Sequence, residues 1–153
     1  MKPLVVLISS FCISVLATKI FYHNWNWIFA GNAAMSSMLL FTAIGHFAFS
    51  KGMAMMMPGF IPFKKGVVFL TGLIEILAAI GLLLPAHRHL AAILLIIFFI
   101  LILPANINAA VKKVDFQKGN YEGSGMNYLW FRVPLQLFFI LWVWYFGLYL
   151  FQN

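Results

Sequence analysis

Five long apolar segments, separated by short polar connectors, constrain this chain more than any other feature. They cover about residues 3–22, 27–49, 66–84, 90–110 and 130–151. A helix needs about 20 apolar residues to cross the hydrocarbon core of a bilayer. Lipid offers no hydrogen bonds to a backbone, so each segment is predicted to be a helix rather than an open sheet. The sequence therefore predicts an all-α fold, a polytopic transmembrane bundle of antiparallel helices with four core spans and an N-terminal fifth.

The composition excludes a soluble domain of this size. Hydrophobic residues make up 64% of the 153 residues and charged residues only 8%, whereas soluble domains average about 45–50% apolar and about 25% charged. A chain of this length has too little interior to bury so much apolar surface away from water. We therefore expect a single membrane domain over residues 1–153, surrounded by a lipid bilayer.

The basic residues predict an orientation and argue against nucleic acid as a partner. The net charge is +7, but the charges lie at the ends of apolar segments and not in the continuous basic patch that nucleic acid requires. With five spans, all Lys and Arg except Lys19 and Arg88 fall on one side of the membrane. The positive-inside rule then predicts a multi-pass protein of the cell inner membrane, with a cytoplasmic N-terminus and an external C-terminus.

The first segment has two interpretations. Lys2, the apolar stretch and the small residue Ala17 fit a signal peptide cleaved after Ala17. Only a few residues separate this segment from the next apolar run, which favours a retained span. Cleavage would leave four spans and would not reverse the others.

The connectors differ in chemistry. Residues 51–65 contain Pro58 beside several methionines and are predicted to form an interfacial turn. Residues 85–89 are predicted to form a tight turn, and the polar, glycine-containing residues 112–127 a flexible loop. Pro134 is expected in the first turn of the last helix, where no backbone donor is lost.

Glu75 is the only acid inside a span and leads the candidate site. A charge at the bilayer centre costs about 2.5–3.5 kcal/mol, so its side chain should face the bundle interior. Gly72 and Ala79, three and four residues away, are small enough to allow close helix contact there. Intramembrane acids are functional candidates by default, while the structural alternative is a buried carboxyl that joins helices. The sequence leaves both open.

The other strong polar groups of the core spans fall at a similar depth, all in the cytoplasmic half. Antiparallel neighbours can bring them together, so we predict one polar pocket, in which Glu75 contacts Arg132 or His46. The pocket consists of His46, Glu75, Asn106, Arg132 and Gln136. Arg132 and Gln136 share a helix face, since they are four residues apart. Each also has an ordinary alternative: a core hydrogen bond for His46, a topology charge for Arg132, and a cap at a proline kink for Asn106.

Several short motifs resemble DoxX-like membrane proteins. They are Gly45-His46-Phe47, Met56-Met57-Pro58, Ile61-Pro62, Thr71-Gly72-Leu73-Ile74-Glu75, Ala79-Ile80-Gly81-Leu82-Leu83, Pro85, Pro104-Ala105-Asn106-Ile107 and Arg132-Val133-Pro134-Leu135-Gln136. In order and spacing they are similar to that family over about residues 31–150, with the first span as an addition to a four-helix pattern. The resemblance implies a role in quinone-linked redox or oxidative-stress systems, or in distant relatives the assembly of other membrane proteins.

Two function classes follow. One is a quinone-linked redox membrane subunit, in which the polar pocket holds a quinone head group, Glu75 and His46 pass protons, and a partner oxidoreductase supplies electrons. The other is a non-catalytic binding or assembly protein, with another membrane protein as its partner. Solute transport is weaker, because no inverted repeat or pair of broken helices is visible. No redox centre or metal site is predicted, since the single Cys12 has no metal-ligand spacing and the methionines are better explained as an apolar anchor.

Overall fold

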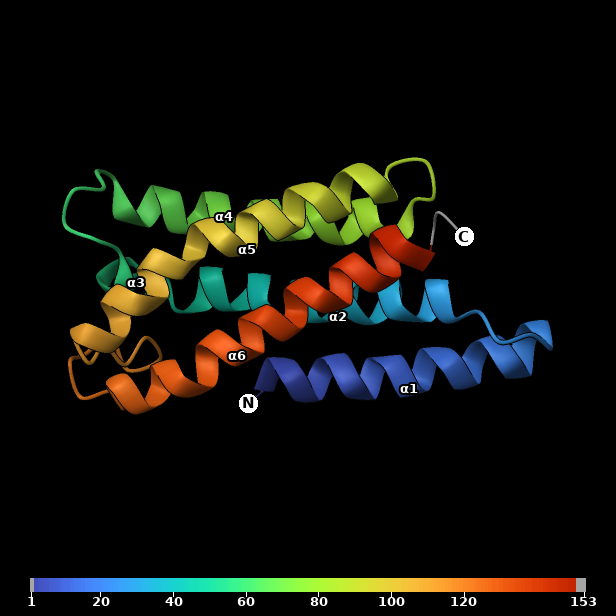
Figure 1. The fold of residues 1–153 in the computed structure, drawn as a ribbon. Helices are drawn as coiled ribbons and strands as arrows, with labels where there is room; N and C mark the ends of the chain where they lie inside the picture. Colours follow the sequence, from blue (N-terminus) through green and yellow to red (C-terminus); the bar gives the residue numbers. More distant parts are fainter. Residues whose placement is uncertain (1, 151–153) are drawn as a thin grey trace.

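Long helices running side by side make up the fold (Figure 1). The computed structural model describes residues 2–150, apart from the Tyr22 side chain. The elements are α1 (Lys2–Tyr22), α2 (Trp27–Ala48), α3 (Ser50–Met56), α4 (Lys64–Leu83), α5 (Arg88–Val111), α6 (Met126–Val143) and the π-helix η1 (Trp144–Tyr149). Five helical stretches, with α6 and η1 counted as one, are long and apolar enough to cross a membrane. The predicted all-α bundle of four core spans and an N-terminal fifth is confirmed.

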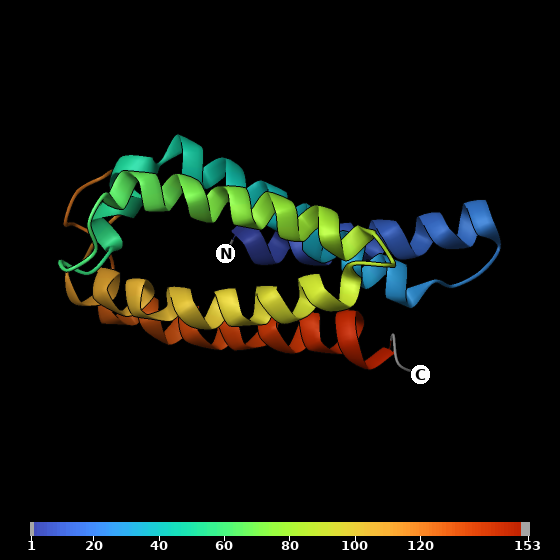
Figure 2. The ribbon, with the colours of Figure 1, turned by 90° about the horizontal axis from the view of Figure 1, so that it is seen from above.

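The helices pack in two groups. In Figure 2, α2 and α4 lie along one side of the bundle and α5 and α6 along the other. The helix α1 packs against α2, and η1 returns to contact both α2 and α5. Both views show α1 shifted along the bundle axis, so that its C-terminal part runs beyond the other helices at the end opposite α3. We call the two ends the α3 end and the η1 end.

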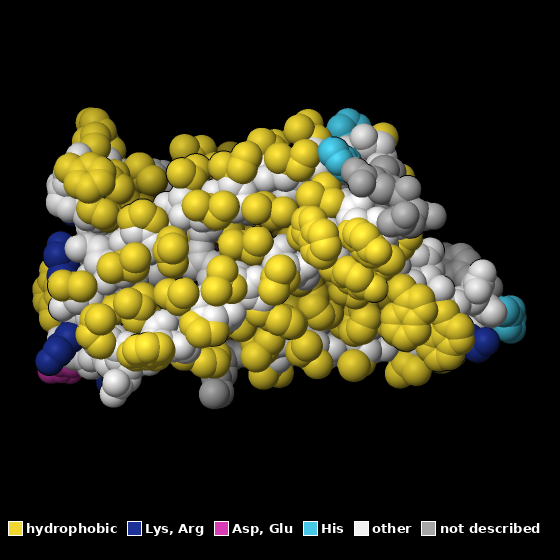
Figure 3. Space-filling model, viewed as in Figure 1, with side chains coloured by type: hydrophobic (Ala, Val, Ile, Leu, Met, Phe, Trp, Pro, Cys, Tyr) yellow, Lys and Arg dark blue, Asp and Glu magenta, His cyan; other side chains and the backbone are white. Residues whose placement is uncertain are grey.

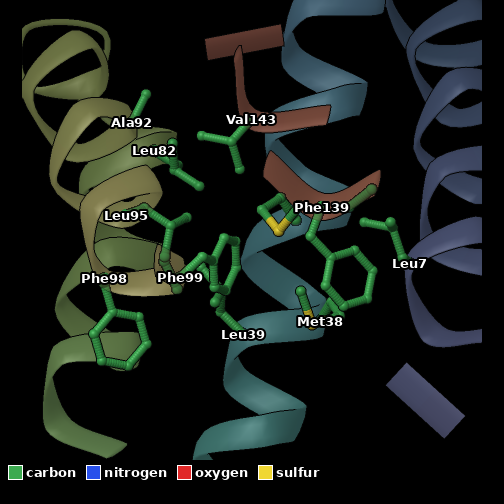
Figure 4. Close-up of a cluster of buried hydrophobic side chains, with 13 residues drawn as sticks. Leu7, Met38, Leu39, Leu82, Ala92, Leu95, Phe98, Phe99, Phe139 and Val143 are labelled. Atoms are coloured by element: carbon green, nitrogen blue, oxygen red, sulfur yellow. The ribbon is translucent and has the colours of Figure 1, made fainter. Parts of the chain in front are cut away.

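A single apolar cluster joins all five spans (Figure 4). Its buried members include Leu7, Met38, Leu39, Leu82, Leu95, Phe99, Phe139 and Val143. Small residues allow the helices to approach closely around it. At Gly31, an added Cβ would lie 2.2 Å from the ring of Phe146, so any larger residue would separate α2 from η1.

The outer surface fits a lipid environment. Large apolar side chains cover the middle of the face seen in Figure 3, while Lys and Arg gather at the α3 end. Leu101 and Leu137, in the middle of their helices, are 70% and 57% exposed. A soluble monomer rarely exposes so large a continuous apolar patch, whereas hydrocarbon tails cover it at no cost.

The connectors add detail to two predictions and correct a third. The predicted interfacial turn contains a short helix, α3. The loop before α6 is folded on itself, because Asp115 and Asn120 pair in an isolated β-bridge. The last helix begins at Met126, after Gly125 with a φ of +59°, so Pro134 lies in the helix interior. The expectation that Pro134 sits in the first turn is wrong, because residues 126–129, before the predicted start at Trp130, already belong to the helix.

Candidate functional site

His46 and Glu75, the predicted contact of the candidate site, meet where α2 packs against α4. His46 Nε2 lies 3.5 Å from Glu75 Oε1, and Glu75 is only 5% exposed. The approach depends on Gly72, where an added Cβ would stand 2.9 Å from the Cβ of His46. The missing side chain therefore lets the imidazole reach the carboxyl inside the bundle. We call these two residues the His46–Glu75 pair.

The other ring nitrogen of His46 is held by α4. Nδ1 lies 2.9 Å from Thr71 Oγ1 and 3.2 Å from the carbonyl oxygen of Val68. The Thr71 hydroxyl donates its own proton to the same Val68 carbonyl at 2.8 Å. Both neighbours of Nδ1 are therefore acceptors, and we assign the ring proton to Nδ1.

This assignment determines what lies between the ring and the carboxyl. A neutral imidazole protonated at Nδ1 presents a lone pair at Nε2. An ionised Glu75 would present a second lone pair, and two acceptors would then face each other. One proton between them removes the conflict, either on the carboxyl or on Nε2. The His46–Glu75 pair is therefore neutral overall when it holds one shared proton.

The second oxygen of Glu75 is the exception in an otherwise satisfied interior. Among the described side chains, Oε2 is the only buried polar atom without a hydrogen-bond partner. Leaving such an atom unsatisfied costs about 1–3 kcal/mol. A small hydrogen-bond donor beside Oε2, such as a water or a hydroxyl group, would remove that cost.

A second polar group joins α5 and α6. Asn106 Nδ2 donates to Gln136 Oε1 at 3.0 Å, and Gln136 Nε2 donates to the backbone carbonyl of Phe99. Both side chains are buried. Pro104 lies in this part of α5 and provides no backbone donor to the preceding turn. We call these two residues the Asn106–Gln136 pair. Among the described residues, its hydrogen bonds run only between the two side chains and to the backbone.

Arg132 does not join either pair. Its guanidinium donates to the hydroxyl of Tyr128, one turn earlier on α6, and its Cζ stands 5.3 Å from the centroid of that ring. The predicted contact of Glu75 is thus made by His46 and not by Arg132. A long basic side chain in a span reaches toward the nearer helix end, which carries the charge away from Glu75. Among the described residues, no hydrogen bond or ion pair links the two pairs or Arg132 to one another.

Sequence reasoning missed the polar residues of the opposite half. Asn32 Nδ2 donates to the carbonyl of Phe146 in η1 at 2.9 Å, and Ser36 Oγ donates to that of Ala79 at 2.8 Å. The buried Arg88 donates from Nε to the carbonyl of Leu82. The expectation that all strong polar groups lie in one half is therefore wrong. The signal was the run of small residues around Asn32, which indicates a buried helix face.

Two hollows in the surface lie away from the His46–Glu75 pair. An open cleft of about 1080 Å³ at the η1 end is lined by residues 24–29 with Thr18 and Tyr145. An apolar hollow of about 340 Å³ between α1 and α6 includes Leu4 and Trp130. Neither is lined by His46 or Glu75. No group of three or more His, Cys, Asp or Glu that could hold a metal ion occurs in residues 2–150.

Comparison with known proteins assigns the chain to a different family from the one that the motifs suggested. No curated protein and no solved structure matches the chain. The resemblance to DoxX-like proteins is wrong, because the family that matches is a different one. The motifs behind it combine Gly, Ala and Pro with single polar residues, a pattern that close helix packing in lipid produces in unrelated bundles. By its match over residues 35–147, the chain belongs to the family described as Domain of unknown function (DUF8561).

Proposed function

We propose that this protein is a non-catalytic membrane binding protein whose His46–Glu75 pair binds one exchangeable proton inside the helix bundle. The observation that carries the proposal is the contact between Nε2 and Oε1, with Nδ1 held by two acceptors. Loss of the proton would leave a net negative charge among apolar side chains, and gain of a second would leave a positive one. Both changes are expensive in a bilayer. Proton binding is therefore coupled to the packing of α2 on α4.

The unpartnered Glu75 Oε2 supports a second part of the proposal. A small molecule with a hydroxyl or amino group would supply the missing donor. Such a ligand would bind beside the shared proton, and its affinity would depend on whether the pair is neutral. The carboxyl would thus bind the ligand through a hydrogen bond, and the chain would not need to catalyse a reaction.

Infrared difference spectroscopy of the protein in lipid nanodiscs, stepped through pH, tests the proton site. We expect a protonated-carboxyl band that disappears in Glu75→Gln and shifts in His46→Gln. The matched control is Glu122→Gln, the same substitution at an exposed loop acid, which should leave the band unchanged. An identical pH difference spectrum in the wild type and in Glu75→Gln would overturn the proposal and favour a purely structural pair.

The orientation is part of the same proposal. The lysines at the α3 end, in Figure 3 and along the sequence, support placing that end in the cytoplasm. The protein would then lie in the cell inner membrane with its N-terminus inside and its C-terminus outside. Reporter fusions at the C-terminus should be active only on the external side. Cytoplasmic reporter activity there would contradict this topology.

A quinone-linked membrane subunit is a second candidate. The hydroxyl group of a reduced quinone is a donor of the kind that Oε2 lacks, and a partner oxidoreductase would supply the electrons that reduce the quinone. The test is whether quinone extracted from purified protein falls in Glu75→Gln and not in Glu122→Gln. Equal amounts in both would remove this candidate. If neither protein retained any Glu75-dependent ligand, assembly of another membrane protein would be the better explanation.

A further inference from the structure

The segment between α3 and α4 exposes aromatic side chains to an unusual degree. Phe60 is 84% exposed and Phe63 is 90% exposed. Phe63 also adopts a φ of +49°, the left-handed region that is unfavourable for a residue with a side chain. Within the described chain, the two rings have no aromatic partner.

Basic side chains follow directly on these rings. Lys64 and Lys65 open α4, and Lys64 also donates to the carbonyl of Met57, which closes the segment into a loop. Neither lysine forms an ion pair with an acid among the described residues. We call residues 60–65 the basic aromatic loop.

The position of this loop indicates that it lies at the membrane surface. It leads into the membrane-spanning helix α4 and includes its first two residues, at the α3 end, where Lys and Arg gather (Figure 3). That is the depth at which lipid headgroups meet acyl chains. Aromatic rings favour this boundary, and the ammonium groups of the lysines that follow can reach the phosphates above it.

We propose that the basic aromatic loop is a binding site for acidic phospholipids of the surrounding leaflet. Phe60 and Phe63 insert at the acyl boundary, and Lys64 and Lys65 contact the headgroup phosphate. Burial of the two rings in lipid compensates for the unfavourable backbone of Phe63. The selectivity for acidic over zwitterionic lipid comes from the two lysines, neither of which has an acidic partner among the described residues.

The experiment uses the full chain purified from nanodiscs of phosphatidylcholine with phosphatidylglycerol, and measures by native mass spectrometry which lipids stay bound. The wild type should retain phosphatidylglycerol in excess. A lysine near an acidic leaflet changes affinity by about fivefold, so Lys64→Gln/Lys65→Gln should reduce this excess by up to about 30-fold. Phe60→Ser/Phe63→Ser should reduce retention of both lipids.

The matched control is Lys112→Gln/Lys113→Gln, which removes the same charge at the same end of the bundle but outside the loop. It should retain phosphatidylglycerol nearly as the wild type does. An equal loss in both lysine pairs would show general charge attraction and overturn the site. A second arm adds inorganic phosphate to lipid-free protein in detergent: protection from heat equal to that given by phosphatidylglycerol would indicate a free-anion site and overturn the lipid proposal. Circular dichroism confirms that each variant remains helical.

Discussion

The His46–Glu75 pair and the Asn106–Gln136 pair each lie between two helices, yet they are built differently. In the Asn106–Gln136 pair, an amide donates to an amide and the network ends on a backbone carbonyl. In the His46–Glu75 pair, two titratable groups meet and one carboxyl oxygen has no partner among the described residues. The Asn106–Gln136 pair therefore joins two helices, whereas the His46–Glu75 pair still has an atom that can accept a hydrogen bond from a ligand.

The comparison also explains why polarity alone is a poor guide to function in a membrane bundle. Lipid cannot satisfy a polar group, so every buried polar side chain must find a partner in the protein. Most do, as Asn32 and Ser36 show with their backbone acceptors. An unsatisfied atom is therefore more informative than a satisfied one, and Glu75 Oε2 is the atom to test.

The largest effect is expected from His46→Ala. It removes the only ion-pair partner of Glu75 among residues 2–150 and leaves the carboxyl buried alone, which destabilises by about 3–5 kcal/mol. Unfolding of the protein in mixed micelles, followed by circular dichroism, measures the change. In the double variant with Glu75→Gln most of the loss should be restored; a double variant as unstable as His46→Ala would mean that the imidazole acts by packing alone.

Gln136→Leu is expected to have the next largest effect. It leaves the Asn106 amide and the Phe99 carbonyl without their partner, for a loss of about 1–2 kcal/mol. The same unfolding measurement applies. Leu137→Ala, at a neighbouring side chain exposed to lipid, is the control and should change less. A larger effect at Leu137 would remove the structural role assigned to the Asn106–Gln136 pair.

Glu75→Gln should change stability by less than about 1 kcal/mol, because a neutral amide fits the same space and avoids a buried charge. Combined with Gln136→Leu, its effect should add within about 0.5 kcal/mol, as expected for sites without shared partners. A larger coupling energy in this double-mutant cycle would mean that the two pairs form one pocket after all.

A similarly small effect is expected from Arg132→Gln. The guanidinium contacts Tyr128 of its own helix, and an interaction of this kind contributes about 0.5–1 kcal/mol at an exposed site. The loss should be the same in the wild type and in a Glu75→Gln background. If Glu75→Gln abolished it, Arg132 would be acting on Glu75, as the sequence alone had suggested.

The order of helices along the chain could be predicted because it depends on local chemistry. Lipid requires long apolar helices, so the five spans and the all-α class follow from apolar run lengths alone. The position of Glu75 in the bundle interior could also be predicted, because a carboxyl facing lipid is unfavourable and Gly72 and Ala79 mark the packed face of its helix. Even the family resemblance failed for a local reason, since small residues and prolines recur in many bundles.

Only the tertiary structure decided which polar groups meet. Residues at equal depth on different helices can face each other or face apart, and rotation of a helix about its axis settles this. His46 reaches Glu75 because Gly72 leaves room for it, while Arg132 turns along its own helix to Tyr128. The π-helical end of the last span and its bond from Asn32 likewise depend on contacts between segments more than 100 residues apart. The sequence determines how deep a residue lies in the membrane, but the packed neighbours of its side chain determine which way that side chain points.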